Sequence, residues 1–539
     1  MNSHIYNTLS SLKFDNTFTR ELPEDTESLN YRRQVFGACY SKVKPAPVSN
    51  PKLIAYSKEA ASLLDLSEDA CKSEEFTQIF SGSKLLSVME PYAACYGGHQ
   101  FGNWAGQLGD GRAITIGEVI NKKSERWTLQ LKGAGATPYS RNADGLAVLR
   151  SSVREFLCSE AMFHLGISTT RALSIIATGE MVERDMFYNG NPKEEPGAVV
   201  CRLAPSFTRF GNFEIFTFRD DIKTLKKLLD YTIKTDFGLY EEPSVKLYIR
   251  WFEEVCRRTA DVVVDWMRVG FVHGVMNTDN MSVLGLTIDY GPYGWIENYD
   301  PNWTPNTTDA HSRRYRFGNQ PNIAHWNLAQ LANAIYPLIE EVEPLQQALS
   351  LYADRFKGRW EQMVAAKLGL KQFEPETDQN LTAELFNLLS MVETDMTIFF
   401  RRLAVLDFTD DLFKAEDDQL ENLKPFMDSY YLPSQLTDDY TARMSNWLKS
   451  YAKRVEKDNQ PYETRRLQMN SVNPKYVLRN YLAQLAIDKA EQGDFSMIER
   501  LLKVLRNPYS EQIENEDLAV KRPDWARHRP GCSMLSCSS

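Results

Sequence analysis

The segment His273-Gly-Val-Met-Asn-Thr-Asp-Asn280, with Asp289-Tyr-Gly291 a short way downstream, decides the fold that this sequence predicts. Both pieces are polar and lie between apolar runs. Their Asp and Asn side chains offer the carboxylate and amide oxygens that hard divalent cations prefer as ligands. The segment therefore indicates a loop that handles a metal ion and phosphate groups.

The spacing of this loop matches that of protein kinases, with one residue displaced. Kinases carry His-x-Asp-x-x-x-x-Asn followed by Asp-Phe-Gly, in which the first Asp is the base and the Asn and the last Asp hold metal ions. Counting from His273 places Asn280 at the kinase Asn. Val275 falls at the base position and cannot accept a proton, whereas Asp279 offers a carboxylate beside the Asn. The pattern predicts a kinase-type nucleotide site without the usual kinase base.

A glycine-rich stretch upstream reads Gly97-Gly-His-Gln-Phe-Gly-Asn-Trp-Ala-Gly-Gln-Leu-Gly-Asp-Gly-Arg112. Glycine adopts positive φ and lets backbone amides approach a ligand closely, and successive amides can form a nest for an anion. A series of turns between strands would use the same residues. Both interpretations stay open from the sequence. The absence of Gly-Lys-Ser/Thr excludes a P-loop.

A Lys and a Glu follow on a predicted strand and a predicted helix. Apolar and polar residues alternate over 126–132, which predicts a strand that ends at Lys132. An apolar stripe predicts a helix over 146–165, with Asp144-Gly145 as its start signal. Kinases pair a strand Lys with a helix Glu, and Glu155 has the right place for it. An exposed Lys and a solvated Glu are the alternatives.

The remaining elements predict an α+β protein with a kinase-like two-lobed fold, a mixed strand and helix N-lobe, and a mainly helical C-lobe with extra C-terminal helices. Further strands are expected at 113–119, 172–177 and 198–203, and helices at 246–268, 323–339, 345–368, 381–408, 436–454 and 477–490. Arg202 and Arg209 flank Pro205 and could hold phosphate oxygens or form surface salt bridges. We expect an N-terminal extension over 1–90, an N-lobe over 91–215, a C-lobe over 216–505 and a tail over 506–539.

Composition narrows the class of protein. The 539 residues are 43% hydrophobic and 25% charged, as is usual for a globular chain. A net charge of -10 argues against broad binding to nucleic acid or to a membrane surface. We see no apolar run of about 18 residues, which a membrane helix needs, and no signal-like start. We therefore expect a cytoplasmic protein without nucleic-acid or membrane partners.

The cysteines indicate neither a disulfide framework nor a zinc site, because no Cys-x-x-Cys occurs. Those at 39, 71, 95, 158, 201 and 256 are expected to be reduced and buried. Cys532 and Cys537 lie in a tail that we expect to be exposed. The tail could be inert, or its thiols could be sensitive to oxidation.

Four long motifs resemble the selenoprotein O family, SelO/YdiU. They are the glycine-rich stretch followed by Ala113, Leu-Gln-Leu-Lys-Gly-Ala-Gly-x-Thr-Pro-Tyr-Ser-Arg (129–141), Val-Leu-Arg-Ser-Ser-x-Arg-Glu-Phe (148–156) and His-Gly-Val-Met-Asn-Thr-Asp-Asn-Met-Ser (273–282). The final Cys-Ser-Ser is similar too, since some members carry selenocysteine where Cys537 stands. The resemblance runs from about residue 30 to the C-terminus.

The resemblance implies a kinase-like enzyme that binds ATP in a flipped orientation and transfers AMP to Ser, Thr or Tyr hydroxyls of proteins, with release of pyrophosphate. Asp279 would then be the catalytic base, and Asn280 and Asp289 would hold Mg²⁺ or Mn²⁺. The nucleotide contacts implied are Gly109, Gly111, Arg112, Lys132, Asp144, Gly145, Glu155, Arg202, Arg209 and Asp289. Cationic side chains suit this reaction, because the leaving pyrophosphate gathers negative charge.

Two departures from the family pattern are visible. Leu146 stands where the family commonly has Arg, which weakens any role for that position. Some members are thought to bridge a tail cysteine to one near the activation segment, but residues 281–531 contain no cysteine. Such a bridge would need another partner, such as Cys256, or be absent. Other readings of the chain are a pseudokinase scaffold, an ordinary kinase and an enzyme that transfers UMP from UTP.

Overall fold

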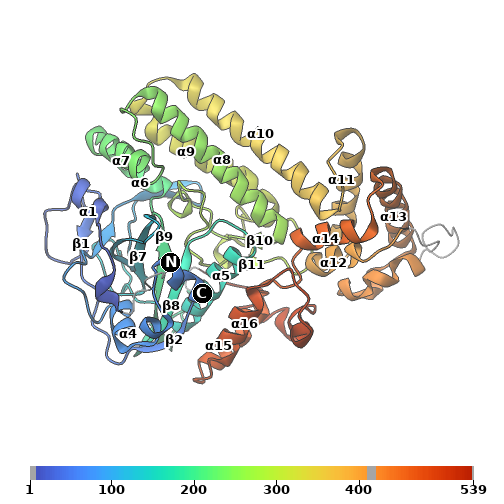
Figure 1. Ribbon diagram of the computed structural model, residues 1–539, viewed down its shortest axis with the longest axis horizontal. Helices are drawn as coiled ribbons and strands as arrows, with labels where there is room; N and C mark the ends of the chain where they lie inside the picture. The colour runs from blue at the N-terminus through green and yellow to red at the C-terminus, as the bar shows by residue number, and fades with distance from the viewer. Residues whose placement is uncertain (1–7, 409–419, 537–539) are drawn as a thin grey trace.

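An antiparallel sheet of seven strands organises the first part of the protein in the computed structural model, which describes residues 8–408 and 420–536 (Figure 1). The spatial order is β1-β3-β6-β7-β9-β8-β2. The strands are β1 (Tyr40–Lys42), β2 (Lys52–Tyr56), β3 (Tyr92–Ala94), β6 (Ala113–Ile120), β7 (Arg126–Lys132), β8 (Arg171–Arg184) and β9 (Lys193–Ala204). Both edge strands, β1 and β2, come from the first 90 residues, so the N-terminal segment is part of this sheet.

The central strands place polar side chains on one face of the sheet. Gln130 and Lys132 are two residues apart on β7, so they lie on the same face. Gln130 pairs with Arg202 on β9, and Lys132 pairs with Val200. Leu129 and Leu131 belong to the opposite face and are fully buried. This alternation gives the sheet one apolar face and one face with buried charged groups.

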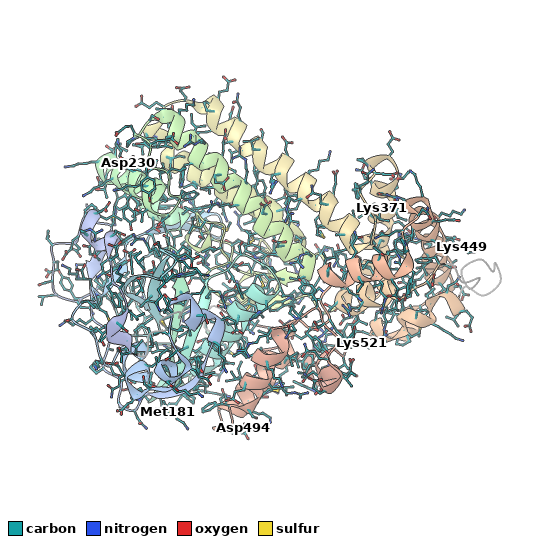
Figure 2. The ribbon with its side chains drawn as sticks, viewed as in Figure 1. Met181, Asp230, Lys371, Lys449, Asp494 and Lys521 are labelled. Carbon is teal, nitrogen blue, oxygen red and sulfur yellow. The ribbon has the colours of Figure 1, made fainter. Side chains whose placement is uncertain are left out.

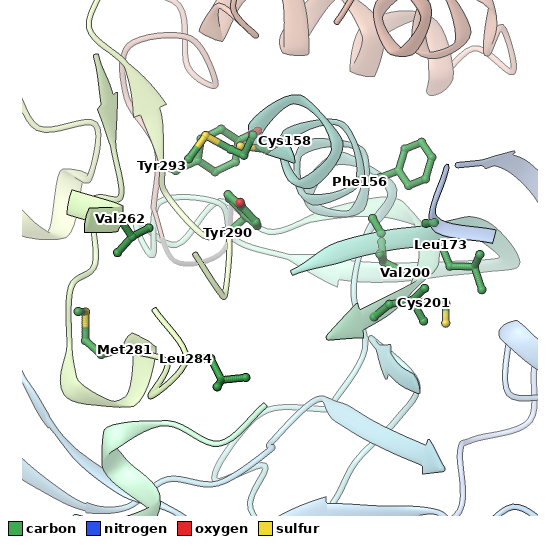
Figure 3. Close-up of a cluster of buried hydrophobic side chains, with 14 of the residues drawn as sticks. Phe156, Cys158, Leu173, Val200, Cys201, Val262, Met281, Leu284, Tyr290 and Tyr293 are labelled. Carbon is green, nitrogen blue, oxygen red and sulfur yellow. The ribbon is translucent and has the colours of Figure 1, made fainter. Parts of the chain in front are cut away.

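Helix α5 (Leu149–His164) packs on β8 and β9, and its buried residues include Phe156 and Cys158 (Figure 3). The helix begins later than the sequence predicts. Asp144 accepts a hydrogen bond from the Leu146 amide at 2.9 Å and closes a turn before the helix. Leu146 then pairs with Ala134 in an isolated bridge. The turn predicted at Asp144-Gly145 and the helix are confirmed, but the helix begins at Leu149 and not directly after this turn.

Three long helices support the loop that contains Asp279 and Asn280. They are α8 (Val245–Val269), α9 (Gln320–Ile335) and α10 (Val342–Lys367), and α8 packs along both of the others (Figure 1). Helix α8 ends at Gly270, whose φ of 76° reverses the chain. Strand β10 (Phe271–Val272) follows and pairs with β11 (Gly294–Trp295). The loop from His273 to Pro292 thus projects from a fixed two-stranded base.

Helices α11 to α14 contribute most of a second hydrophobic core and lie away from the sheet in Figure 1, whereas α15 and α16 pack on α5. The remaining helices are α1 (Thr17–Glu21), α2 (Lys58–Leu63), α3 (Glu68–Lys72), α4 (Glu74–Phe80), α6 (Phe210–Phe218), α7 (Ile222–Thr235), α11 (Pro375–Met391), α12 (Met396–Ala404), α13 (Asp438–Asp458), α14 (Tyr462–Val472), α15 (Asn480–Ala490) and α16 (Ser496–Leu505). The single helix predicted over 381–408 is wrong. The structure divides this segment between α11 and α12, because the Asp395 side chain accepts from the Ile398 amide at the start of α12 and pairs with Arg479.

The C-terminal tail packs against the segment that follows the loop from His273 to Pro292. The Leu535 carbonyl accepts from the Thr307 amide at 2.7 Å, and the Leu535 amide donates to Pro305 at 2.9 Å. Cys532 is buried, which raises the pKa of its thiol to about 11. The expected exposure of this cysteine is therefore wrong, and a buried neutral thiol is a poor nucleophile. Cys537 lies outside the described residues.

The six earlier cysteines are buried and free, as the sequence predicts. Over residues 8–408 and 420–536, none of the helices combines the length and apolar character needed to span a membrane.

Candidate active site

A cluster of charged side chains lies on the polar face of the sheet. Lys132 Nζ is 2.6 Å from Glu155 Oε2. Arg202 Nη1 is 3.1 Å from Glu155 Oε1 and 2.6 Å from Asp289 Oδ1. Arg209 Nη1 pairs with the other oxygen of Asp289. Two carboxylates thus hold three cations, and these five groups come from β7, α5, β9 and two loops.

Most charged groups of this protein lie at the surface, as Lys371 and Asp494 do in Figure 2. In contrast, Lys132 and Glu155 are 8% and 2% exposed. Burying a charge is costly unless a partner compensates it. The alternatives of an exposed Lys132 and a solvated Glu155 are wrong, and the predicted pair between them is confirmed as a contact.

Neighbouring cations keep Asp289 ionised. Burial acts to raise the pKa of Asp289, but Arg209, Arg202 and Lys132 outweigh it and hold that pKa well below its ordinary value. Burial lowers the pKa of Lys132, against the attraction of Glu155. The cluster gathers three cations that can pair with an anionic ligand, while Asp110 and Asp279 place two further carboxylates near Arg209.

Asp279 and Asn280 lie on a short 3₁₀ turn, Thr278–Asn280, after β10. Burial raises the pKa of Asp279 to about 7. Its backbone carbonyl accepts from Arg209 Nη1 at 2.8 Å, so Arg209 connects it to Asp289. Asn280 Nδ2 donates to the Val275 carbonyl at 2.9 Å, which leaves the amide oxygen as the atom available to a cation.

These groups line one cleft of about 620 Å³, a volume typical of small-ligand sites. Ten of the residues implied by the family resemblance line it: Gly109, Gly111, Arg112, Lys132, Asp144, Gly145, Arg202, Asp279, Asn280 and Asp289. Glu155 and Arg209 are not among the lining residues but contact Lys132 and Asp289, which are. Val275, at the kinase base position, also lines the cleft. The structure therefore brings all the predicted site residues together.

The two central glycines of the cleft are needed for close packing. Gly109 has φ 81°, and a Cβ there would lie 2.4 Å from the ring of Tyr139. Gly145 has φ 78°, and a Cβ there would lie 2.2 Å from the carbonyl carbon of Gly135. Any larger residue at either position would push the wall of the cleft outward.

Similarity to known proteins supports the same assignment. The family model described as protein adenylyltransferase SelO matches residues 27–506. The chain belongs to the SelO family. Proteins named protein nucleotidyltransferase YdiU from Rhodopirellula baltica and Aromatoleum aromaticum are each 58% identical over 536 residues, which cover 98% of this chain and 99% and 100% of theirs. The protein of that name from Flavobacterium johnsoniae is 52% identical over 531 residues, 98% of this chain and 100% of its own.

This SelO-family chain is therefore an enzyme that transfers a nucleotidyl group to protein. Its site includes residues that the sequence did not single out. Arg184 on β8 holds Asp144 through two bonds of 2.7 Å. Gln130 accepts from Arg202, and its place two residues before Lys132 could have revealed it. No local signal indicates Arg184, because it is distant from Asp144 in the sequence.

The first part of the glycine-rich stretch forms a hairpin of β4 (Gly97–Gln100) and β5 (Asn103–Gln107). The His99 amide donates to Thr278 Oγ1 at 2.7 Å, which fixes this hairpin on the catalytic loop. The sequence left open a nest for an anion or a series of turns between strands, and residues 97–107 instead form two paired strands joined by one turn. Gly109 and Gly111 lie beyond the hairpin, at the cleft.

A possible metal group outside the cleft consists of Glu59, Glu160 and His164. Glu160 pairs with Arg171 at 2.6 Å and Glu59 with Arg506 at 2.7 Å, but Asp289 is paired with arginines as well, so the donor atoms and not the ion pairs distinguish the two groups. The cleft offers a better donor set. Asn280 and Asp289 supply only oxygen atoms, which fit Mg²⁺ or Mn²⁺.

Proposed function

We propose that this enzyme transfers AMP from ATP to Ser, Thr or Tyr hydroxyls of proteins and releases pyrophosphate. The observation that carries the proposal is the presence, in one cleft, of a buried carboxylate with a pKa of about 7 beside the cations Arg112, Lys132 and Arg202. A general base works best when its pKa is close to the working pH. The cations suit the triphosphate of the donor.

In the proposed reaction, Asp279 accepts the proton of the protein hydroxyl. The hydroxyl oxygen forms a bond to the α-phosphorus, and the bond from that phosphorus to the leaving pyrophosphate breaks. Negative charge then accumulates on the pyrophosphate. Lys132, Arg202 and Arg112 line the cleft and can stabilise this charge. Arg209 and Glu155 keep these groups in place through Asp289 and Lys132.

Asn280 and Asp289 would hold the Mg²⁺ or Mn²⁺ ion, which supplies positive charge to the phosphates when bound. Asp289 also pairs with Arg202 and Arg209. The low pKa that these partners give Asp289 favours the role, because a metal ligand must be deprotonated.

We also propose that the architecture is kinase-like and two-lobed. The sheet and α5 would form an N-lobe over 91–215, to which 1–90 adds its edge strands. The helices over 216–505 would form the C-lobe, and 506–539 a tail. The cleft supports this division, since Lys132 and Arg202 reach it from the sheet and Asp279 and Asp289 from the helical part.

A label-transfer experiment tests the proposed function. The protein is incubated with casein as acceptor, Mg²⁺ or Mn²⁺, and ATP labelled at the α- or the γ-phosphate. We expect label on casein, or on the enzyme itself, from the α position alone. Label from the γ position alone would make the protein a kinase. Nucleotide binding with no transfer from ATP or from α-labelled UTP would make it a scaffold.

A further inference from the structure

The carboxylate of Asp279 has two oxygens in different surroundings. Asp279 Oδ2 accepts a hydrogen bond from Gln100 Nε2 at 3.3 Å. Asp279 Oδ1 is buried and has no hydrogen-bond partner within residues 8–408 and 420–536. The side chain that orients the base therefore comes from outside the catalytic loop.

Gln100 is fixed relative to this loop by its two neighbours. The His99 amide donates to Thr278 Oγ1 at 2.7 Å. The Phe101 amide donates to Asn277 Oδ1 at 3.2 Å. Thr278 and Asn277 immediately precede the base in the sequence. Gln100 thus lies between two anchored amides, so the backbone carries its side chain to a set position beside the base.

Gly98 of the same hairpin covers the other oxygen. A Cβ at Gly98 would lie 2.9 Å from Asp279 Oδ1 and 3.0 Å from Asp279 Cβ. The lack of a side chain at this position therefore lets β4 approach the carboxylate closely. Because Oδ1 is closed off, Oδ2 is the oxygen left for a hydroxyl. Gln100 also lines the cleft, on the same side as Oδ2.

We propose that Gln100 is a positioning residue for nucleotidyl transfer, which holds Asp279 Oδ2 as the proton-accepting oxygen while Gly98 closes off Oδ1. This inference rests on the proposed function, because it takes Asp279 as the base. A carboxylate oxygen can accept two hydrogen bonds, so Oδ2 can keep the Gln100 bond and receive the hydroxyl proton. Gln100 itself gives up no proton in the step, in which the bond to the α-phosphorus forms and the bond to pyrophosphate breaks.

Three variants test this role at pH 8 by the rate of label transfer from α-labelled ATP. Gln100→Ala is expected to lower kcat about tenfold, the effect of losing one hydrogen bond to a charged group, with KM for ATP changed less than about twofold. Gln100→Glu keeps the size of the side chain but replaces the donor by a second carboxylate, which repels Asp279. We expect it to lower kcat at least as much as Gln100→Ala. The control Gln347→Ala, at an exposed position of α10, should match the unaltered protein.

The Glu variant separates positioning from packing. If Gln100 only fills space, its isostere Glu should retain more activity than Ala, and this result would overturn the proposal. An unchanged kcat in Gln100→Ala would overturn it as well. Asp279→Asn distinguishes the two levels of inference. If Asp279→Asn loses transfer but the Gln100 variants stay fully active, only the role of Gln100 is refuted. If Asp279→Asn keeps full transfer, Asp279 is not the base, and the role proposed for Gln100 is refuted with it.

Discussion

Replacement of Asp289 by Asn removes one negative charge from the centre of the cation cluster with little change to the backbone. Asp289 has φ 55°, in the left-handed region, which Asn adopts more easily than Ala. The Asn oxygen can still accept one hydrogen bond. What it cannot supply is the charge that faces Arg202 at 2.6 Å and also pairs with Arg209. The variant therefore measures the charge and not backbone strain.

The geometry sets the size of the effect. Removal of one partner from a buried ion pair costs about 3–5 kcal/mol, because the other charge stays buried without compensation. Glu155 still pairs with Lys132 at 2.6 Å and with Arg202 at 3.1 Å. These contacts offset part of the loss, so we expect the free energy of unfolding to fall by about 3 kcal/mol, the lower end of that range.

The pH dependence of this difference follows from the direction of the pKa shift. Burial acts to raise the pKa of Asp289, but Arg209, Arg202 and Lys132 hold it well below the ordinary value. A carboxyl with a lowered folded-state pKa stabilises the protein fully above its unfolded pKa of about 3.9, and this stabilisation is lost as the pH falls through the folded value. The difference between the two proteins should therefore be constant from about pH 5 to 6, below the range near pH 7 in which Asp279, whose pKa the Asp289 charge helps to raise, titrates.

Urea unfolding followed by tryptophan fluorescence measures the stability, and label transfer from α-labelled ATP measures the activity. Asp220 provides a matched control, because it also has φ 55° but is exposed. Asp220→Asn should change the free energy of unfolding by less than about 0.5 kcal/mol. We expect Asp289→Asn to abolish transfer and the gain in ATP affinity that metal provides. A stability loss no larger than that of the control would refute the electrostatic reasoning, and full transfer would refute the metal-ligand assignment.

Three further results are expected. Burial raises the pKa of Asp279 to about 7. Because a general base must be ionised, kcat/KM should fall about tenfold per pH unit below pH 7. A flat profile of kcat/KM from about pH 5 to 8 would contradict this assignment. Gly109→Ala should lower the melting temperature and weaken ATP binding, since its Cβ would lie 2.4 Å from Tyr139; an unchanged melt counts against the packing argument. EDTA should stop transfer, and added Mg²⁺ or Mn²⁺ should restore it. Undiminished transfer in EDTA would show that the reaction needs no metal ion.

Local patterns allowed much of the secondary structure to be predicted from the sequence. The strand predicted over 126–132 is β7 to the residue, because its alternation is a property of neighbouring positions. The helix predicted over 246–268 differs from α8 (Val245–Val269) by one residue at each end. Elements decided by distant contacts were missed. The division between α11 and α12 depends on Asp395, which caps α12 and binds Arg479, the residue before α15.

Exposure was the least predictable property. The tail around Cys532 is short and mostly polar, which predicts a solvated end. It is covered because Leu535 pairs with the segment at Pro305 and Thr307, and no local pattern encodes that contact. The same holds for Arg184, whose bonds to Asp144 join a strand to a loop.

The sequence by itself determined which residues can carry the chemistry, because the spacing of the catalytic loop and the long family motifs identify Asp279, Asn280 and Asp289. The tertiary structure alone decided what these groups can do. It gathers three cations around Asp289, buries Asp279 and brings Gln100 to its oxygen. The physical reason is that a pKa depends on burial and on charges nearby in space, and neither follows from the separation of residues along the chain.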